Sequence, residues 1–223
     1  MEQYGKQVQE FISLDGGVGA IVNKAVGSKR YRVEIDTEGG HSYSRFGNRN
    51  AIAYLASLIG TLYNIKVPSK GRTTCNVGTI SGGTSVNTIA QHAEMLYEFR
   101  SDERESLEIM EKHFCAAIEY YRTKGIQVQV TLVGDRPCSG DVDIEREEQM
   151  AKRIAAAVKR HFGQEPVMGT ASTDCNIPLS MGINALCVGC VCGTGAHTRE
   201  EYVEINSLRP GLGLAFELVL QHF

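Results

Sequence analysis

The chain has 223 residues, of which 42% are hydrophobic, with a formal net charge of −3 and a sequence pI of about 6.1. This length suits one large domain or two small ones, and the hydrophobic fraction is enough for a packed core. No basic run stands out, so a nucleic acid is not an expected partner. No apolar stretch approaches the roughly 20 residues of a membrane helix, and residues 1–15 have no apolar segment typical of a signal peptide.

The chain opens with a short apolar segment, Val8–Leu14, which we expect to be a strand ending at Asp15. Residues 30–133 then show alternating and helical patterns in turn. Asp102 and Glu105 resemble a capping box that opens the second helix of this region. The patterns predict strands over 31–35, 73–80, 95–99 and 126–132, and helices over 52–62 and 105–118.

This order, β-α-β-β-α-β, is the pattern of a ferredoxin-like domain, in which two helices cover one face of a sheet. We therefore predict that residues 29–133 form a domain that could fold on its own. The flanks, residues 1–28 and 134–223, contain α/β pieces that bracket it. Their patterns predict a helix over 144–162, strands over 167–170 and 185–191, and a closing helix over 205–223.

We interpret the flanks as one α/β domain interrupted by the inserted domain. Two or three strands are few for such a sheet, because its strands need cover on both faces. We therefore expect part of this sheet to come from outside the chain, which makes the α/β domain incomplete.

Seven cysteines lie between Cys75 and Cys192, an odd and sparse set that argues against a disulfide scaffold. A reduced, cytoplasmic protein is the simplest interpretation. Cys187, Cys190 and Cys192 form a C-x-x-C-x-C pattern inside an apolar run. Because a buried cysteine behaves as a small hydrophobe, we expect these three to pack in a strand rather than hold a metal.

The stretch Gly193–Thr198 is the most informative motif, because it places His197 directly after the predicted strand over 185–191. Ligand sites of open α/β sheets gather at the carboxyl ends of strands, and a neutral imidazole is a common zinc ligand. From spacing alone, a loop histidine beside a glycine turn is the commoner interpretation.

Three further motifs follow predicted strands. The string 171–176 contains Asp174 and could face the same cleft, or be an ordinary turn with Asp and Asn caps. His41 in Gly39–Ser42 could donate a hydrogen bond to an oxyanion, or be a solvated loop histidine. Gly82–Asn87 is glycine-rich, but no Lys-Ser/Thr follows its glycines, so it is not a phosphate loop. No G-x-S-x-G elbow of a serine hydrolase is present.

Together these motifs resemble the C-terminal portion of the di-zinc metallopeptidase family of peptidase T, tripeptidase, glutamate carboxypeptidase and acetylornithine deacetylase. The resemblance covers nearly the whole chain, with the motifs in the order of that family. It implies an α/β zinc domain interrupted by a ferredoxin-like lid that usually dimerises. The matching segments are 11–16, 40–42, 50–52, 82–87, 172–178, 182–185 and 195–203.

The resemblance also implies roles in metal binding and catalysis. His197 would be a ligand of one zinc, and Asp15 would be a carboxylate ligand of the other. His41 would reach the site of a partner subunit and stabilise the oxyanion there.

Four residues would bind or support the substrate by the same resemblance. Asn87 and Arg100 would hold the substrate's backbone or terminal carboxylate. Gly195 would line the substrate pocket, and Asp174 would support it.

The chain departs from the family pattern before Asp15. The family carries a His-x-Asp motif, a bridging Asp and a Glu-Glu pair upstream of that position, and residues 1–14 contain none of them. Zinc takes about four ligands, so Asp15 and His197 alone would not complete two sites.

We therefore expect the C-terminal portion of a zinc-dependent peptidase, of the aminopeptidase or tripeptidase type, that acts on short peptides through zinc-activated water. The isolated chain is expected to be inactive, so whether it is an enzyme by itself stays open. The alternative is a non-catalytic dimerisation or peptide-binding module derived from such a peptidase. Under either hypothesis we expect a homodimer formed through the lid.

Overall fold

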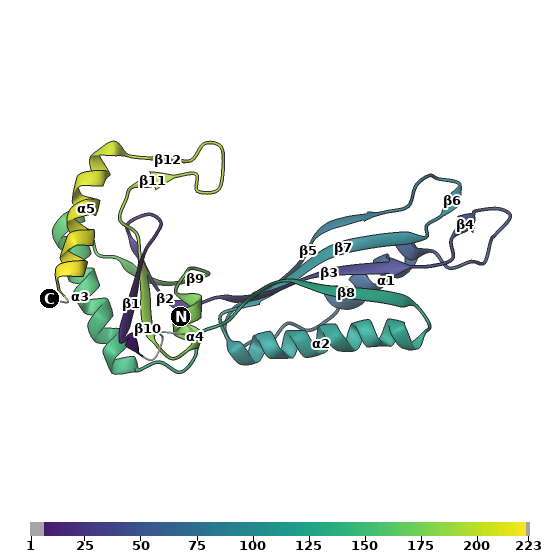
Figure 1. Cartoon of the computed structure of the whole chain (residues 1–223), viewed down its shortest axis with the longest axis horizontal. Helices are drawn as coiled ribbons and strands as arrows, with labels where there is room; N and C mark the ends of the chain where they lie inside the picture. Colours follow the sequence, from purple (N-terminus) through teal and green to yellow (C-terminus); the bar gives the residue numbers. More distant parts are fainter. Residues whose placement is uncertain (1–6, 222–223) are drawn as a thin grey trace. The chain divides into compact units, whose positions relative to one another are not determined.

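The computed structural model describes residues 7–221, and the chain divides into two compact units (Figure 1). Unit 1 combines residues 1–26 with residues 137–223, and unit 2 is the continuous segment 27–136. The chain therefore leaves unit 1 after Val26, builds unit 2, and returns at Pro137. Within residues 7–221, no helix has the length and apolar character that crossing a membrane requires.

The main part of unit 2 is a four-stranded antiparallel sheet with two helices on one face (Figure 1). The order of its strands is β5-β7-β3-β8, so β5 and β8 are the two edges. The expected β-α-β-β-α-β order and the ferredoxin-like fold class are confirmed. The elements are β3 (Gly27–Asp36), α1 (Ala51–Tyr63), β5 (Thr73–Gly82), β7 (His92–Ser101), α2 (Arg104–Thr123) and β8 (Gln127–Arg136).

Alternation along β3 and β7 builds the core of unit 2. Every second residue of these strands is buried under the helices, and the residues between them face the open side of the sheet. Tyr31 stacks on Phe114 of α2 with ring centroids 4.5 Å apart, and Tyr97 stacks on the same ring at 5.6 Å. These offset aromatic contacts fix α2 against the sheet.

The expected capping box at the start of α2 is wrong. The N-cap is Glu103, whose side chain makes no capping hydrogen bond. A carboxylate oxygen of Asp102 instead accepts a hydrogen bond at 2.7 Å from the backbone N–H of Arg72. Asp102 therefore ties the start of β5 to the end of β7 rather than opening the helix.

Unit 1 contains a four-stranded mixed sheet in the order β1-β10-β2-β9. The strands are β1 (Glu10–Leu14), β2 (Ala20–Ala25), β9 (Val167–Ala171) and β10 (Asn184–Val188). β10 is parallel to β1 and antiparallel to β2, and β2 is parallel to β9. The sequence patterns did not predict β2, and β10 ends three residues before the expected Val191.

Helices cover both faces of this sheet. Helices α3 (Ile144–Phe162) and α5 (Ile205–Leu220) pack on one face through a cluster that includes Ile21, Ile154, Leu186 and Leu214. The short helix α4 (Asn176–Ser180) packs on the other face, where Leu179 meets Ala185 and Cys187.

Helix α3 has the bounds that the sequence predicts, because its end signals are local. The side chain of Asp143 accepts a hydrogen bond from the Arg146 N–H, and Gly163 ends the helix at φ 71°. Acidic residues occupy its first turn and basic residues its last turn, which suits the helix dipole.

Helix α5 carries a second apolar stripe that no described residue covers. One stripe, centred on Leu214 and Leu218, is buried against the sheet and α3. The other lies at helical spacing on the opposite side and is exposed: Leu208, Leu212, Phe216 and Val219. A helix that is apolar on two faces is typical of one buried on both.

We expect residues 27–136 to fold without unit 1, because their sheet is complete and two helices cover one face of it. The expected result is a single cooperative thermal transition of the isolated segment, followed by circular dichroism. The absence of a cooperative transition would contradict this independence.

Candidate metal and substrate site

A pocket of about 400 Å³ opens at the carboxyl edge of the unit 1 sheet, and Asp15, His197 and Glu201 all line it. Asp15 directly follows β1, and its N–H donates to the carbonyl of Val188, the last residue of β10, at 3.1 Å. Because β1 and β10 are parallel, both strands deliver the following residues to the same edge. The sheet therefore brings Asp15 and His197, the two expected zinc ligands, to one pocket.

His197 lies at the tip of a hairpin formed by β11 (Gly193–Thr194) and β12 (Tyr202–Val203). Its φ is +67°, and among residues 7–221 it is the one non-glycine residue with a positive φ. Its N–H donates to a carboxylate oxygen of Glu201 at 3.2 Å. Left-handed backbone at a histidine costs free energy and is frequent at functional sites.

The positive φ of His197 leads to a prediction about the stability of variants at this position. His197→Gly is expected to leave the protein about 1 kcal/mol more stable than His197→Ala, because glycine adopts positive φ without a Cβ penalty. Chemical denaturation of the two variants measures the difference. Equal stability of the two would show that the backbone at residue 197 is not strained in solution.

Gly195 and Asp174, the expected pocket residues, lie on the surrounding loops. Gly195 has φ +76° and turns the backbone between Thr194 and Ala196, which both line the pocket. Asp174 is exposed and follows β9. Its charge reaches the buried thiol of Cys187, as does the charge of Asp15, so both carboxylates lie near this cysteine.

Two cysteines near the pocket, Cys187 and Cys190, have raised pKa values. Burial, together with the charges of Asp15 and Asp174, raises the pKa of Cys187, and its thiol donates to the Asp15 carbonyl at 3.7 Å. Burial and the charge of Asp15 also raise the pKa of Cys190. Since a thiolate is the metal ligand, this environment disfavours metal binding by these cysteines.

Asn176, for which the sequence suggested a turn cap as one alternative, is a buried residue. Its amide nitrogen donates at 2.9 Å to the carbonyls of both Val26 and Pro137, where the chain leaves and re-enters unit 1. Its amide oxygen accepts from the Thr173 N–H at 2.8 Å. Asn176 thus joins both crossing points to the loop that carries Asp174.

In unit 2, His41 and Asn87 lie together at one end of the molecule's lid sheet. A short antiparallel pair, β4 (Gly40–His41) with β6 (Thr88–Ile89), holds them, and the Ser42 N–H donates to the Asn87 carbonyl at 2.9 Å. The Nδ1 atom of His41 accepts from the Tyr43 N–H at 3.3 Å. In the neutral ring this leaves the proton on Nε2, which is then free to act as a donor.

Arg100 lies at the opposite end of unit 2. It pairs with Ser28 in the β3–β7 register, beside the point where the chain enters the lid from Val26. His92 begins the same strand, and eight residues of strand span about 26 Å. The structure therefore does not bring Arg100 to His41 and Asn87 within the lid.

A bidentate pair with Glu98 holds the Arg100 guanidinium, with both nitrogen–oxygen distances at 3.1 Å. Burial pushes the pKa of Glu98 up, but hydrogen bonds and charges from Arg100 and Arg30 outweigh this and lower the pKa. Arg100 would have to exchange Glu98 for a substrate carboxylate to play its expected role.

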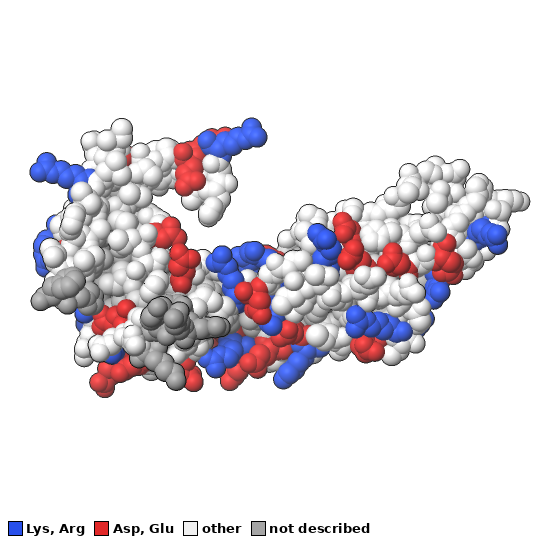
Figure 2. Space-filling view, viewed as in Figure 1, with Lys and Arg blue, Asp and Glu red and all other residues white. Residues whose placement is uncertain are grey.

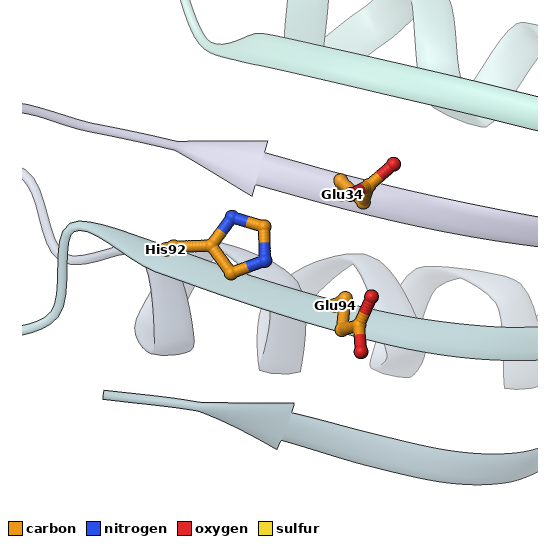
Figure 3. A group of neighbouring side chains, drawn as sticks. All are labelled: Glu34, His92 and Glu94. Atoms are coloured by element: carbon orange, nitrogen blue, oxygen red, sulfur yellow. The ribbon is translucent and has the colours of Figure 1, made fainter. Parts of the chain in front are cut away.

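A second cluster of possible ligands lies on the open face of the lid sheet (Figure 3). The ligand atoms of Glu34, His92 and Glu94 lie within 4.8 Å of one another. Asp36 orients His92 through its Nδ1 atom at 2.9 Å. Arg32 lies 3.8 Å from Glu94, and the Ser81 hydroxyl donates to the same carboxylate at 3.2 Å, so Glu94 and His92 both have protein partners.

The fold and the site can be compared with known proteins. The family model of the peptidase dimerisation domain, M20 type, matches residues 23–122. The chain is 31% identical over 100 residues to N-acetyldiaminopimelate deacetylase of Bacillus pumilus (strain SAFR-032). This alignment covers 43% of this chain and 25% of the deacetylase.

Solved structures resemble both units. A tripeptidase from Staphylococcus aureus subsp. aureus Mu50 matches with a TM-score of 0.76 and 22% identity, over 94% of this chain and 56% of the tripeptidase. Aminopeptidase PepT from Bacillus cereus ATCC 10987 matches with a TM-score of 0.72 and 21% identity, over 95% and 57% of the two chains. The chain thus spans little more than half the length of these structures.

Because each match covers at least 94% of this chain, both units have counterparts in the folds of these two proteins. Residues 23–122 match the model of a peptidase dimerisation domain, and the fold of the chain is similar to part of the fold of this tripeptidase and this aminopeptidase.

Proposed function

We propose that the chain is the lid and C-terminal portion of a zinc-dependent peptidase of the aminopeptidase or tripeptidase type, which hydrolyses short peptides. The observation that carries this proposal is the pocket at the carboxyl edge of the unit 1 sheet, where Asp15 and His197 meet. A carboxylate and an imidazole are ligand types that zinc accepts.

We infer that this pocket supplies part of a zinc site. Zinc takes about four ligands, and the described residues offer Asp15 and His197 there, while Glu201 is engaged by the His197 N–H. The remaining ligands would come from polypeptide outside residues 1–223. The exposed stripe of α5 supports this, because such a face suits cover by a further segment.

The roles of the chain's residues in the complete enzyme follow from their chemistry. Bound zinc would polarise the scissile carbonyl and activate water. His41 of one subunit would donate from Nε2 to the developing oxyanion in the other subunit's site. Asn87 would hold the peptide backbone next to His41, since β4 and β6 keep the two together.

Three further roles concern the substrate and its pocket. Arg100 would bind a carboxylate at the other end of the lid. Gly195 would let the pocket wall approach the peptide, and Asp174 would support the pocket from the β9 loop. We further propose a homodimer formed through the lid, in the cytoplasm, where the seven cysteines would stay reduced.

A second candidate is a non-catalytic dimerisation or peptide-binding module. The match of the family model favours it, because residues 23–122 are nearly confined to the lid. This function would need neither Asp15 nor His197.

Zinc titration by calorimetry distinguishes the two. The enzyme proposal predicts weak binding by the wild-type chain, reduced about tenfold or more in both Asp15→Asn and His197→Ala. His92→Ala is the matched control for the lid cluster and should leave this binding unchanged. Binding that survives both pocket substitutions but is lost in His92→Ala would contradict the proposal.

A further inference from the structure

Two bulges interrupt the lid sheet at the same level. One adds Val133 to β8 next to the partner of Tyr31, and the other adds Gly78 to β5 next to the partner of Tyr97. Tyr31 and Tyr97 are themselves paired in the β3–β7 register. The bulges therefore flank one cross-strand pair, one on each edge strand of the sheet. Bulges bend a strand and are frequent next to active sites.

Between the bulges, the sheet carries a hollow of about 250 Å³, which we name the lid hollow. Both bulge residues line it, together with Arg30 of β3, Leu96 and Glu98 of β7, and Asn76 and Thr79 of β5. The lining side chains of β3 and β7 alternate with the buried ones, so they project from the open face of the sheet. All of these residues belong to unit 2.

One part of the lid hollow is apolar and open. Leu96 is 39% exposed and Val133 is 51% exposed, so both side chains are accessible to a ligand. Gly78 leaves the neighbouring space free, because a Cβ at this position would meet only the Asn76 amide nitrogen, at 3.6 Å. An apolar group of a few carbon atoms would therefore lose contact with water on entering the hollow, which favours its binding.

Arg30 gives the lid hollow a cation with unused hydrogen-bond donors. Its Nε donates to Glu98 at 3.1 Å, and Glu98 also accepts the bidentate pair from Arg100. Two guanidinium groups therefore share one carboxylate. The terminal nitrogens of Arg30 make no hydrogen bond to any residue within 7–221, while the Nε bond holds the group in place. The planar edge of a guanidinium matches the two oxygens of a carboxylate.

The β5 side of the lid hollow is polar but neutral. Residues 73–91, which include β5, contain no charged residue. Figure 2 shows charged side chains along the middle and the α2 side of the lid, away from the β5 margin. Asn76 and Thr79 offer an amide and a hydroxyl, and neither side chain hydrogen-bonds to another residue in the described part of the chain. Such groups suit the amide of a ligand.

We propose that the lid hollow binds an amino-acid residue that has an apolar side chain and a free carboxylate. The carboxylate pairs with the terminal nitrogens of Arg30, and the apolar side chain packs on Leu96 and Val133. The amide of the same residue meets Asn76 and Thr79. The hollow contains neither Asp15 nor His197, so this inference goes beyond the proposed peptidase site.

The end of a peptide and a free amino acid share this chemistry, but they differ at the nitrogen atom. A peptide end has a neutral amide there, whereas a free amino acid has an ammonium group. Glu98 is the one carboxylate among the described residues that line the hollow, and Arg30 and Arg100 already share it. An ammonium group would find no free anion in the hollow, so the geometry favours the peptide end.

Titration of the full chain with N-acetyl-L-leucine, followed in backbone ¹H–¹⁵N spectra, tests the proposal. We expect saturable shifts at Gly78, Leu96 and Val133 and a dissociation constant on the order of 1 mM, because the ligand is small. N-acetyl-L-leucinamide lacks the carboxylate and N-acetylglycine lacks the apolar side chain, so each should bind at least about fivefold more weakly. L-leucine distinguishes the sources: weaker binding than N-acetyl-L-leucine assigns the hollow to a peptide end, and equal binding to either source.

Matched variants locate the binding. Arg30→Gln should weaken binding of N-acetyl-L-leucine about fivefold or more, whereas Arg32→Gln, on the same face but outside the hollow, should change it less than about twofold. Leu96→Ala should also weaken binding, and Leu132→Ala should not, because Leu132 does not line the hollow. Thermal unfolding of each variant confirms that it folds.

Four results would overturn the proposal. They are the absence of saturable shifts at tens of millimolar N-acetyl-L-leucine, equal binding of N-acetyl-L-leucinamide, wild-type affinity in Arg30→Gln or Leu96→Ala, and a loss in Arg32→Gln as large as in Arg30→Gln. No zinc is added and no peptide bond is cleaved, so the site of unit 1 is tested separately.

Discussion

The pure chain, supplied with zinc, is expected to show no appreciable cleavage of dipeptides or tripeptides. Its pocket offers Asp15 and His197, and one carboxylate oxygen of Glu201 accepts a hydrogen bond from the His197 N–H. A general base typically contributes 10² to 10⁴-fold to the rate, and a metal-activated nucleophile contributes more. Within residues 7–221, the pocket offers fewer than the roughly four ligands that zinc takes, so we expect the metal-activated nucleophile to be missing.

The assay compares wild type with His197→Ala over a range of zinc concentrations. Equal background rates in the two proteins are the expected outcome. Zinc-dependent cleavage by the wild-type chain that disappears in His197→Ala would show that residues 1–223 form a complete site. It would contradict the proposal that some zinc ligands come from polypeptide outside these residues.

Asn176→Ala is expected to destabilise unit 1 by about 3 kcal/mol. The substitution removes a 2% exposed side chain and leaves the Val26 and Pro137 carbonyls and the Thr173 N–H without their partner. An unsatisfied buried polar group costs about 1–3 kcal/mol, and partial relaxation keeps the sum below three full penalties.

Urea denaturation measures this loss. Asn176→Asp should also destabilise the unit, because a carboxylate would face two carbonyls without a donor. Asn206→Ala, at an exposed position of α5, is the matched control and should stay within about 0.5 kcal/mol of wild type. A loss in Asn176→Ala as small as that of the control would show that the chain crossings do not depend on this side chain.

Elements with local signals could be predicted from the sequence. Helix α3 was placed at its true bounds because Asp143 and Gly163 mark its ends. The lid strands were recognised because their buried residues alternate regularly. The ferredoxin-like order followed from these elements alone.

Other features depend on contacts between distant segments. Strand β2 is short and exists by pairing with β10 and β9, more than 140 residues away in the chain. Asp102 has the sequence context of a cap, but it bonds the Arg72 backbone across the sheet edge. The distance between Arg100 and His41 could be judged only from the register of β7.

In the candidate site, too, some features could be predicted from the sequence and others could not. That Asp15 and His197 reach one pocket could be expected from strands that end at the same sheet edge. The left-handed backbone of His197 and its bond to Glu201 had no sequence signal, because the hairpin of β11 and β12 is only two residues long on each side.

The central claim is that the pocket of unit 1 holds zinc through Asp15 and His197. Its most direct test is a pair of ¹H–¹⁵N spectra, one of the histidine side chains and one of the backbone amides, recorded during zinc addition in the His92→Ala protein to remove the lid cluster. The account predicts that the imidazole signals of His197 and the backbone amide signal of Asp15 shift first and together. Zinc-induced shifts confined to other histidines, with His197 unchanged, would contradict it.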